Sequence, residues 1–162
     1  MTVGLRPTTA ADLDFVMTAE SDPEATPYVT VWSRWEHEHA IADSDQSHLL
    51  IHDGGEPVGF ILLAGLDGRH RNLELRRIVV ARRGRGLGRQ ALALVLNRCF
   101  SELGAHRVWL DVKPHNERAL RAYRALGFVH EGVLRDAELA NGKWESLAIM
   151  SVLEHEWAGR RA

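Results

Sequence analysis

The chain has 162 residues and a formal net charge of −2; 45% of its residues are hydrophobic and 26% are charged. This length suits one domain, residues 1–162, and the near-neutral charge provides no basic field that would attract a nucleic acid. The single cysteine, Cys99, excludes an intramolecular disulfide and a multi-cysteine metal site. No stretch resembles a signal segment or reaches membrane-spanning length, so we expect a cytoplasmic protein with no membrane partner.

The first third of the chain predicts one short strand and two helices, at residues 3–6, 8–19 and 33–42. The Ser33-x-x-Glu36 pattern is a capping box at the start of the second helix. Three aromatic residues lie close together between or within these helices: Tyr28, Trp32 and Trp35. They could line the substrate side of a cleft, or they could pack a helix onto a sheet.

The middle of the chain predicts an antiparallel meander of three strands, at residues 48–52, 57–66 and 73–80. Polar and glycine-containing turns at residues 53–56 and 67–72 separate these strands. The meander runs directly into a turn that contains three alternating glycines, Gly84, Gly86 and Gly88.

The remainder predicts helices at residues 90–100 and 116–126, and strands at residues 106–112, 128–134 and 145–153. Gly127 suits the C-terminal cap of the second of these helices. A helical crossover joins strands 73–80 and 106–112, so these two should be parallel. We therefore expect an α/β fold (an α+β mixed sheet), mostly antiparallel, with helices on both faces.

The glycine turn is the strongest functional signal in the sequence. Because glycine has no Cβ, backbone N–H groups there can approach a ligand closely. The first turn of the following helix leaves N–H groups unpaired and carries a partial positive charge. Four arginines add formal charge around it: Arg82, Arg83, Arg85 and Arg89. This combination favours a seat for a pyrophosphate, with a plain solvated basic turn as the alternative.

Two other phosphate-binding patterns fit less well. A Walker loop requires a lysine followed by Ser or Thr after the last glycine, and Arg89-Gln90 supplies neither. The stretch from Gly86 to Ala91 matches the dinucleotide pattern G-x-G-x-x-A, and Asp111 lies 20 residues beyond it. However, four residues separate this pattern from the preceding strand, and the preceding strands form an antiparallel meander. Only about 70 residues follow the pattern, too few for the second half of a dinucleotide-binding fold together with a catalytic domain.

Three segments resemble the GNAT superfamily of acyl-CoA N-acyltransferases. Arg83-Gly84-Arg85-Gly86-Leu87-Gly88 matches its [Q/R]-x-x-G-x-[G/A] signature, and residues 116–128 resemble its N-x-x-A-x-x-x-Y-x-x-x-G-F segment. The tail, with Glu131-Gly132-Val133-Leu134-Arg135 and Lys143-Trp144, resembles the RimJ/RimL-like branch. Glu145-Ser146 departs from the aspartate pattern of that branch.

The resemblance implies a GNAT-like fold, in which strands 73–80 and 106–112 splay apart, and acetyl transfer from acetyl-CoA to an amine. It places the cosubstrate along the strand end and the glycine turn, where the Val80 N–H could polarise the thioester carbonyl. The implied cofactor-binding residues are Ile78, Val79, Val80, Arg83, Gly84, Arg85, Gly86, Leu87, Gly88, Arg89 and Asn116.

The resemblance also implies two catalytic residues. Tyr123 stands at the family's tyrosine and would protonate the departing thiolate as general acid. A base must take a proton from the amine, since an alkylamine is mostly protonated near pH 7. We expect Glu74, which by strand alternation would share a face with Ile78 and Val80, with Asp111 as the alternative. A core tyrosine and a Glu74–arginine ion pair are the non-catalytic alternatives.

The sequence leaves the identity of the acceptor amine open. The branch resemblance suggests a protein N-terminal α-amine, such as that of a ribosomal protein, whereas a polyamine, amino acid or antibiotic is the alternative. An acidic cleft would favour a polyamine, and acids occur near the second helix: Glu36, Glu38, Asp43 and Asp45. A non-catalytic CoA-binding module is a further alternative. Homodimers are common in this family, and the histidines show no spacing that suggests a metal.

Overall fold

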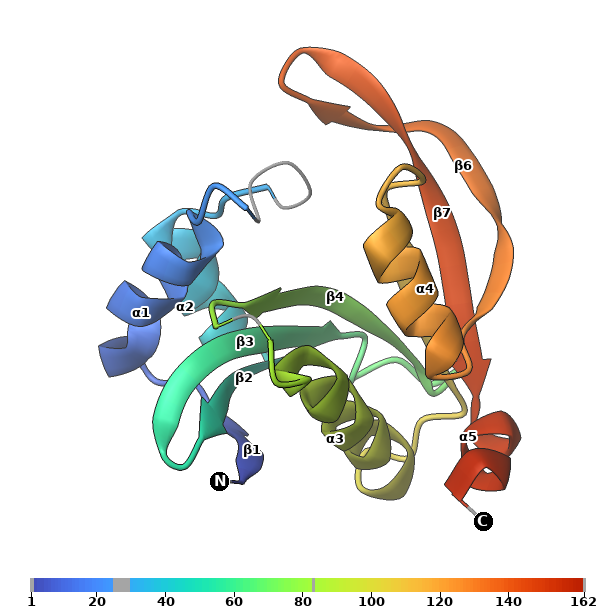
Figure 1. The fold of residues 1–162 in the computed structure, drawn as a ribbon, viewed down its shortest axis with the longest axis horizontal. Helices are drawn as coiled ribbons and strands as arrows, with labels where there is room; N and C mark the ends of the chain where they lie inside the picture. Colours follow the sequence, from blue (N-terminus) through green and yellow to red (C-terminus); the bar gives the residue numbers. More distant parts are fainter. Residues whose placement is uncertain (1, 25–29, 83, 162) are drawn as a thin grey trace.

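The structure, a computed structural model, describes residues 2–24, 30–82 and 84–161. Within these ranges, seven strands form one sheet in the order β1-β2-β3-β4-β5-β7-β6 (Figure 1). All neighbouring strands are antiparallel except β4 and β5, which are parallel as expected. The strands are β1 (Val3–Pro7), β2 (Gln46–Asp53), β3 (Glu56–Ala64), β4 (Asn72–Val80), β5 (Arg107–Val112), β6 (Val129–Ala140) and β7 (Lys143–Leu153).

Helices cover both faces of this sheet, which confirms the expected architecture (Figure 1). The helix pair α1 and α2 lies on one face, and α3 lies across the other. The helical elements are a 3-10 turn (Ala10–Asp12), α1 (Leu13–Glu20), α2 (Arg34–Ala42), α3 (Leu87–Ser101), α4 (Glu117–Ala125) and α5 (Glu154–Arg161).

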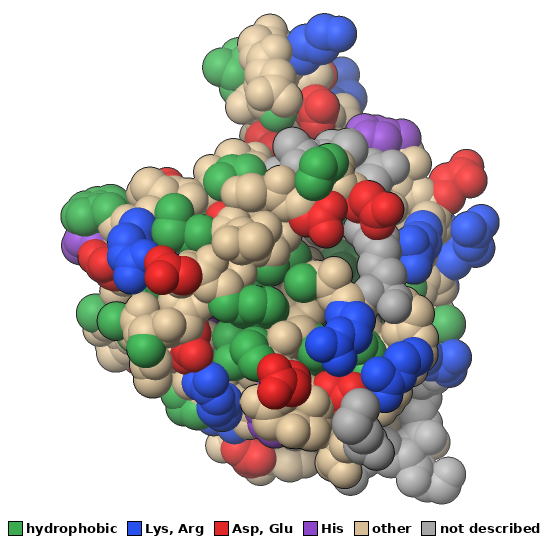
Figure 2. Space-filling view, turned by 60° about the vertical axis from the view of Figure 1, so that its left-hand side comes forward, with side chains coloured by type: hydrophobic (Ala, Val, Ile, Leu, Met, Phe, Trp, Pro, Cys, Tyr) green, Lys and Arg blue, Asp and Glu red, His purple; other side chains and the backbone are tan. Residues whose placement is uncertain are grey.

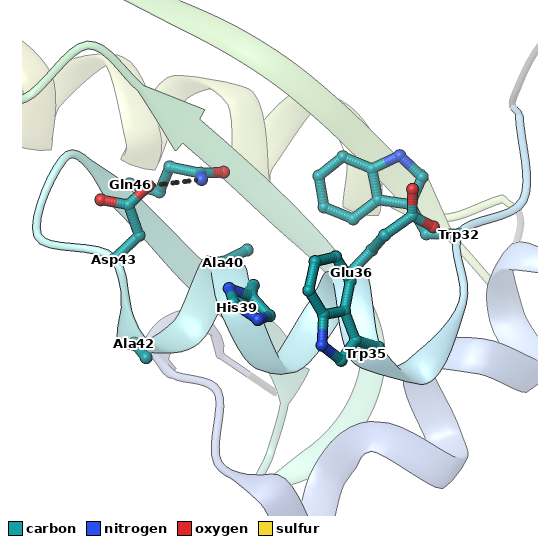
Figure 3. Close-up of a pocket in the computed structure, with 8 residues that line it drawn as sticks. All are labelled: Trp32, Trp35, Glu36, His39, Ala40, Ala42, Asp43 and Gln46. Carbon is teal, nitrogen blue, oxygen red and sulfur yellow. Dashed lines mark hydrogen bonds between the residues drawn. The ribbon is translucent and has the colours of Figure 1, made fainter.

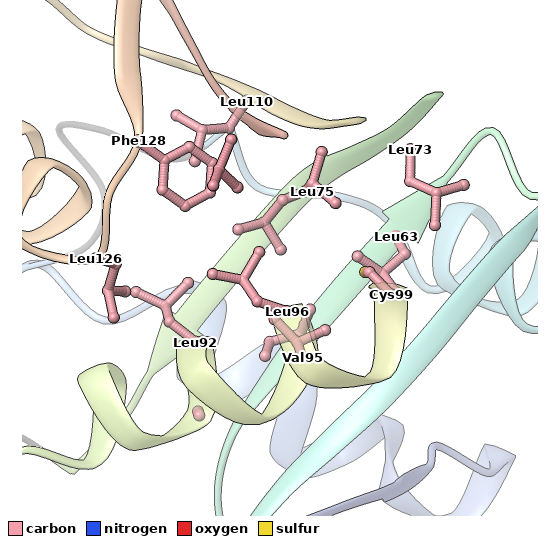
Figure 4. Packing of buried hydrophobic residues seen from close by; sticks show 14 of the residues in the cluster. Leu63, Leu73, Leu75, Leu92, Val95, Leu96, Cys99, Leu110, Leu126 and Phe128 are labelled. Atoms are coloured by element: carbon pink, nitrogen blue, oxygen red, sulfur yellow. The ribbon is translucent and has the colours of Figure 1, made fainter. Parts of the chain in front are cut away.

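The core lies in two layers because successive strand residues point to opposite faces. In β2, Leu49 and Ile51 pack on the α3 side, whereas Leu50 packs under α1. On the α3 side, Cys99 and its helix neighbours meet leucines of β3 and β4, and residues that follow α4 close the cluster (Figure 4). Cys99 is fully buried, and burial raises the pKa of its thiol to about 12, consistent with a core role.

The predicted caps are present in the structure. Ser33 Oγ accepts the Glu36 N–H at 3.2 Å, and the Ser33 N–H donates to Glu36 Oε2 at 2.6 Å. Gly127 has φ of 99°, and its N–H donates to the Arg124 carbonyl at 2.9 Å at the end of α4.

Several elements differ from the sequence expectation. Helix α3 begins at Leu87 rather than Gln90, so Leu87, Gly88 and Arg89 form its first turn. Strands β6 and β7 extend to residues 140 and 143 as a two-stranded arm, where mostly exposed side chains give no burial pattern. Helix α5 was not expected at all; it is anchored by Trp157, whose Nε1 donates to Asn97 Oδ1 at 2.8 Å.

Strands β4 and β5 splay apart along most of their length. Over the described strands they pair only at Asn72–Arg107, Leu73–Val108 and Glu74–Trp109, although β4 continues to Val80. The gap that opens beyond Glu74 is the splay that the sequence resemblance implied.

A bulge in β4 changes which residues face each layer. Leu62 of β3 pairs with Arg77, but Leu63 pairs with Leu75, so Arg76 is an extra residue. As a result Leu75 and Ile78, three residues apart, both pack on the α3 side.

The expectation that Glu74 shares a face with Ile78 and Val80 is therefore wrong. Because it alternates with Leu73 and Leu75, Glu74 faces the α1–α2 side of the sheet, as does Asp111 of β5.

A buried polar chain ties α1 and α2 to the sheet. We define it by four residues: Thr8, His48, His37 and Glu20. Thr8 Oγ1 lies 2.8 Å from His48 Nδ1, His48 Nε2 lies 3.1 Å from His37 Nδ1, and His37 Nε2 lies 3.1 Å from Glu20 Oε1. Each of these four residues is at most 5% exposed, so the side chains of the buried polar chain depend on one another for hydrogen bonds.

We predict that acid destabilises the fold through His48. Burial lowers the pKa of His48 from 6.5 to about 4. The unfolded chain therefore binds more protons than the folded chain in this window. The free energy of unfolding should fall by about 3 kcal/mol as the pH drops from 6.5 to about 4. Urea denaturation across this pH range measures it.

The matched variants are His48→Asn and His39→Gln. His48→Asn should unfold more easily but with a flatter pH dependence, because the titrating group is gone. His39 is exposed on α2, so His39→Gln should keep the wild-type slope. An unchanged slope in His48→Asn would contradict the assignment.

Candidate active site

The glycine turn forms the N-terminal end of α3. Gly86 is its N-cap with φ of 68°, and Gly84 has φ of 85°. The left-handed conformation at both positions favours glycine. The first intrahelical bond runs from the Gln90 N–H to the Gly86 carbonyl at 3.0 Å. The N–H groups of Leu87, Gly88 and Arg89 have no partner of this kind, so they can bind an anion.

A cavity of about 700 Å³ lies between this turn, the end of β4 and α4. We call it the first cavity. Its size and its row of backbone N–H groups fit a phosphate-bearing ligand with an extended arm. The predicted cofactor-binding residues that line it are Ile78, Val79, Val80, Gly84, Gly86, Leu87, Gly88, Arg89 and Asn116.

Two of the predicted cofactor-binding arginines, Arg85 and Arg83, are not in this list of lining residues. Arg85 does not line the first cavity; its Nη2 lies 3.2 Å from Oδ2 of the buried Asp53 at the end of β2. Its side chain therefore holds the turn against the sheet. Arg83 lies outside the described residues, whereas Arg82, which the sequence counted only as nearby charge, does line the cavity.

The open edge of β4 faces the first cavity with unpaired backbone groups. The Ala81 N–H donates to the Val58 carbonyl of β3 at 2.7 Å. Because successive N–H groups along a strand point to opposite edges, the Val80 and Ile78 N–H groups point toward the gap beside β5. They are placed as the sequence resemblance implied for a pantetheine arm and a thioester carbonyl.

A second cavity of about 300 Å³ lies on the α1–α2 side of the gap. It is lined by both acidic and basic side chains: Glu74, Arg76, Arg77, Asp111, Lys113 and Glu138. Acidic and basic side chains are likewise interspersed over the face of the molecule shown in the space-filling view (Figure 2). The sequence did not predict Lys113 or Glu138, because they come together only through the pairing of β5, β6 and β7.

Tyr123 stands where the two cavities meet. Both cavities are lined by Ile78, Asn116, Ala119 and Tyr123. The Tyr123 ring packs edge-on against Phe128, with centroids 5.5 Å apart. Burial, with a contribution from Asp111, raises the pKa of its hydroxyl to about 12. The group therefore stays protonated and able to donate throughout the neutral and mildly alkaline range.

Asn116 contributes to helix α4 as well as to the cavities. Its Oδ1 accepts the Ala119 N–H at 3.2 Å, which makes it the N-cap. The sequence analysis assigned it only a cosubstrate contact. The cap explains how the residue also fixes the orientation of Tyr123 two turns later.

The two candidate bases differ in their partners. Glu74 Oε1 accepts from Arg76 Nη2 at 2.9 Å and Nε at 3.1 Å, so the ion-pair alternative raised from the sequence is present. Partial burial raises the pKa of Asp111, and the charges of Glu74 and Glu138 raise it further. Both carboxyl groups line the second cavity.

The three predicted substrate-side aromatic residues have different positions. Trp32 lines the second cavity. Trp35 is 64% exposed and stacks on His39 along α2, with centroids 3.8 Å apart, in a separate shallow groove that Trp32 also borders (Figure 3). Tyr28 lies outside the described residues. Of the described pair, only Trp32 reaches the second cavity.

Among the described residues, no group of three or more His, Cys, Asp or Glu side chains could hold a metal ion. In the same part of the chain, no helix combines the length and apolar character needed to cross a membrane.

Comparison with known proteins identifies the family. The model of the acetyltransferase (GNAT) family matches residues 12–128, which is more than half of the chain. The chain therefore belongs to the GNAT acetyltransferases, enzymes that use acetyl-CoA, as the sequence resemblance predicted.

Individual relatives refine this picture. The spermidine N(1)-acetyltransferase of Escherichia coli K12 is 28% identical over 96% of this chain and 88% of its own. The [ribosomal protein uS5]-alanine N-acetyltransferase of the same strain is also 28% identical, but over 48% of this chain and 40% of its own.

The fold is shared with solved structures. A spermidine N-acetyltransferase from Vibrio cholerae, in complex with CoA and spermine, superimposes with a TM-score of 0.86. At 23% identity, it covers 96% of this chain and 98% of its own. The similarity extends over nearly the whole chain, and it confirms the GNAT fold.

We predict that substitution of Gly86 weakens CoA binding, whereas substitution of Gly104, which also has a positive φ, does not. Alanine at Gly86 would have to adopt φ of 68°, a conformation that costs an L-residue about 1–2 kcal/mol. CoA affinity should fall about tenfold, since the binding-competent turn becomes less populated. Titration calorimetry with CoA measures this.

Gly104→Ala is the matched control. Gly104 has φ of 70°, so alanine there carries a similar backbone cost, but the residue does not line the first cavity and CoA affinity should be nearly unchanged. If the two variants weakened CoA binding equally, the explanation by the local conformation of the glycine turn would fail.

Proposed function

We propose that this acetyltransferase acts on a small polyamine, moving the acetyl group of acetyl-CoA to one of its primary amines. The observation that carries the proposal is the second cavity, which is small and lined by Glu74, Asp111 and Glu138. Polyamines carry several ammonium groups near pH 7, and carboxylates are their natural partners.

The relatives support the polyamine alternative better than the protein N-terminal α-amine that the sequence analysis put first. The spermidine acetyltransferases match nearly the full chain, whereas the ribosomal-protein enzyme matches less than half of it. The assignment to the RimJ/RimL-like branch and the cytoplasmic location stay predictions. So does a homodimer, for which the arm of β6 and β7 offers exposed apolar side chains at Val133, Leu134, Leu139 and Trp144.

The first cavity fits acetyl-CoA. At Gly84 an added Cβ would meet nothing within 4 Å, and at Gly86 its nearest atom would be 3.8 Å away, so the turn leaves open space beside its backbone. We infer that the α3 N–H groups and Arg89 hold the pyrophosphate, and that the edge of β4 holds the pantetheine arm. The bound cosubstrate supplies an activated acetyl thioester.

We infer that the chain's own residues act from the two sides of the gap. The acceptor amine enters through the second cavity, where a carboxylate takes a proton from its nitrogen. The neutral nitrogen forms a bond to the acetyl carbon as the bond to sulfur breaks, and it loses a second proton as it becomes the amide nitrogen. The Val80 N–H polarises the carbonyl oxygen, Tyr123 donates its hydroxyl proton to the departing sulfur, and the second proton released by the nitrogen restores the Tyr123 hydroxyl through water.

We propose Glu74 as the base, with Asp111 as the second candidate. Both face the α1–α2 side, from which the amine would approach. One oxygen of Glu74 is occupied by the ion pair with Arg76, whereas the raised pKa of Asp111 makes that carboxylate a better proton acceptor. The raised pKa is the reason why Asp111 is retained as a candidate base.

We predict a preference for polyamines over peptides. The kcat/KM for spermidine should exceed that for a peptide with an N-terminal alanine, and the KM for spermidine should rise with salt concentration as the carboxylates are screened. Thiol release from acetyl-CoA measures both. A higher kcat/KM with the peptide would return the assignment to a protein N-terminal acceptor.

We predict that Tyr123→Phe lowers kcat about a hundredfold or more with little change in the KM for acetyl-CoA, because a general acid is lost. In the wild type, the raised Tyr123 pKa of about 12 means that the rate should not decline on the alkaline side below that pH. An unchanged kcat in Tyr123→Phe would contradict its role.

The same pH series discriminates between the bases. The rate falls at acidic pH when the base becomes protonated. If Glu74 is the base, Glu74→Gln removes this acidic limb and Asp111→Asn keeps it. The reverse result would assign proton removal to Asp111.

A further inference from the structure

Glu20, at the end of α1, is a fully buried acid outside both cavities. Its Oε2 accepts from Arg77 Nη1 at 2.9 Å, and its Oε1 accepts the Trp32 backbone N–H at 2.8 Å. His37 Nε2 lies 3.1 Å from the same Oε1. The Glu20 carboxylate is therefore the last member of the buried polar chain, at the point where that chain reaches the second cavity.

The groups that Glu20 holds form one wall of the second cavity. Thr30, Trp32 and Arg77 all line it. Arg77 also donates to the Thr30 carbonyl, and its guanidinium lies over the Trp32 ring at 4.2 Å from the centroid. One carboxylate thus orders the whole wall, directly for Trp32 and Arg77 and through Arg77 for Thr30.

The cations of the second cavity are compensated in different ways. Arg76 pairs with Glu74, and Lys113 pairs with Glu138 at 2.6 Å, so each has a partner within the lining; Lys113 also pairs with Glu145 at 2.7 Å, outside it. Arg77 differs from both, because its acidic partner among the described residues, Glu20, lies behind the wall. Without Glu20, an unneutralised guanidinium would face any cationic acceptor.

The buried histidines keep Glu20 in place. A carboxylate only accepts hydrogen bonds, so His37 donates from Nε2. The other ring nitrogen of His37, Nδ1, lies 3.1 Å from His48 Nε2, and His48 Nδ1 lies 2.8 Å from the Thr8 hydroxyl. Each polar group of this buried series has a partner, which gives Glu20 a fixed position.

We propose that Glu20 is a specificity-determining positioning residue: it fixes the Arg77–Trp32 wall and neutralises Arg77, so that the cavity admits polycationic acceptors. The inference rests on the proposed function, because it assigns the second cavity to the acceptor amine. Glu20 does not touch the acceptor and acts through Arg77. The exposed acid Asp14 on the same helix pairs instead with Arg34 and has no such role.

The experiment compares spermidine with n-butylamine, a monoamine without the additional ammonium groups. Five proteins are assayed for acetyl transfer: wild type, Glu20→Gln, Arg77→Gln, the double variant and, as the control, Asp14→Asn. Glu20→Gln should raise the KM for spermidine about tenfold more than the KM for n-butylamine, which is about 1.4 kcal/mol of selectivity.

The double variant tests charge rather than packing. With both charges removed, the selectivity for spermidine should return toward the wild-type value, since the two introduced glutamine amides can pair with each other. Arg77→Gln alone should leave the KM for spermidine unchanged or lower it, and Asp14→Asn should behave as wild type. If Glu20→Gln fails to fold, the Arg77→Gln result carries the test.

Three outcomes would overturn the inference: an equal rise in KM for both amines in Glu20→Gln, no recovery in the double variant, or a higher KM for spermidine in Arg77→Gln. A wild type that acetylates neither amine is a different result. It would refute the proposed function, whereas the three outcomes above leave polyamine acetylation intact.

Discussion

The structure depends on one constraint: β4 and β5 begin as parallel neighbours and then stop pairing after Glu74. Each residue beyond that point on β4 keeps its bonds to β3 but has an open edge opposite. Buried backbone groups rarely stay unpaired, so such an edge needs a ligand or water. The gap is therefore both a structural weakness and the passage that joins the two cavities.

The two sides of this gap are chemically different. On the α3 side, the N-terminal end of α3 and nearby arginines produce a positive potential suited to phosphates. On the α1–α2 side, the three lining cations that the structure describes pair with four carboxylates, and Asp111 adds a fifth, so acids outnumber cations there. Opposite potentials would draw an anionic cosubstrate and a cationic acceptor to opposite ends of one passage. Tyr123 lies where they meet.

Local chemistry explains what the sequence could predict. The glycine turn, the helix caps at Ser33 and Gly127, and the strand order from β2 to β5 follow from neighbouring residues, and the structure confirms them. The bulge at Arg76 was not visible, because a period of two was the only available guide to strand faces. It moved Glu74 to the opposite face from Ile78.

Contacts between distant segments account for the remaining differences. Lys113 meets Glu138 across 25 residues, and Arg77 meets Glu20 across 57. The sequence spacing of such pairs carries no signal. The long arm of β6 and β7 buries little, so it lacks the hydrophobic alternation by which a strand is recognised. The acceptor side was therefore less predictable than the cosubstrate side.

This asymmetry follows from the chemistry that each side performs. Binding a pyrophosphate relies on backbone N–H groups, which one short turn can present, and so its signature is compact. Selecting an amine relies on side-chain charges, which several elements must bring together and each of which needs compensation. Glu20 shows how far this reaches: a residue with no access to the cavity determines the charge that the cavity presents. Acceptor specificity in this chain is thus a property of the α1–α2 packing as much as of the cavity lining.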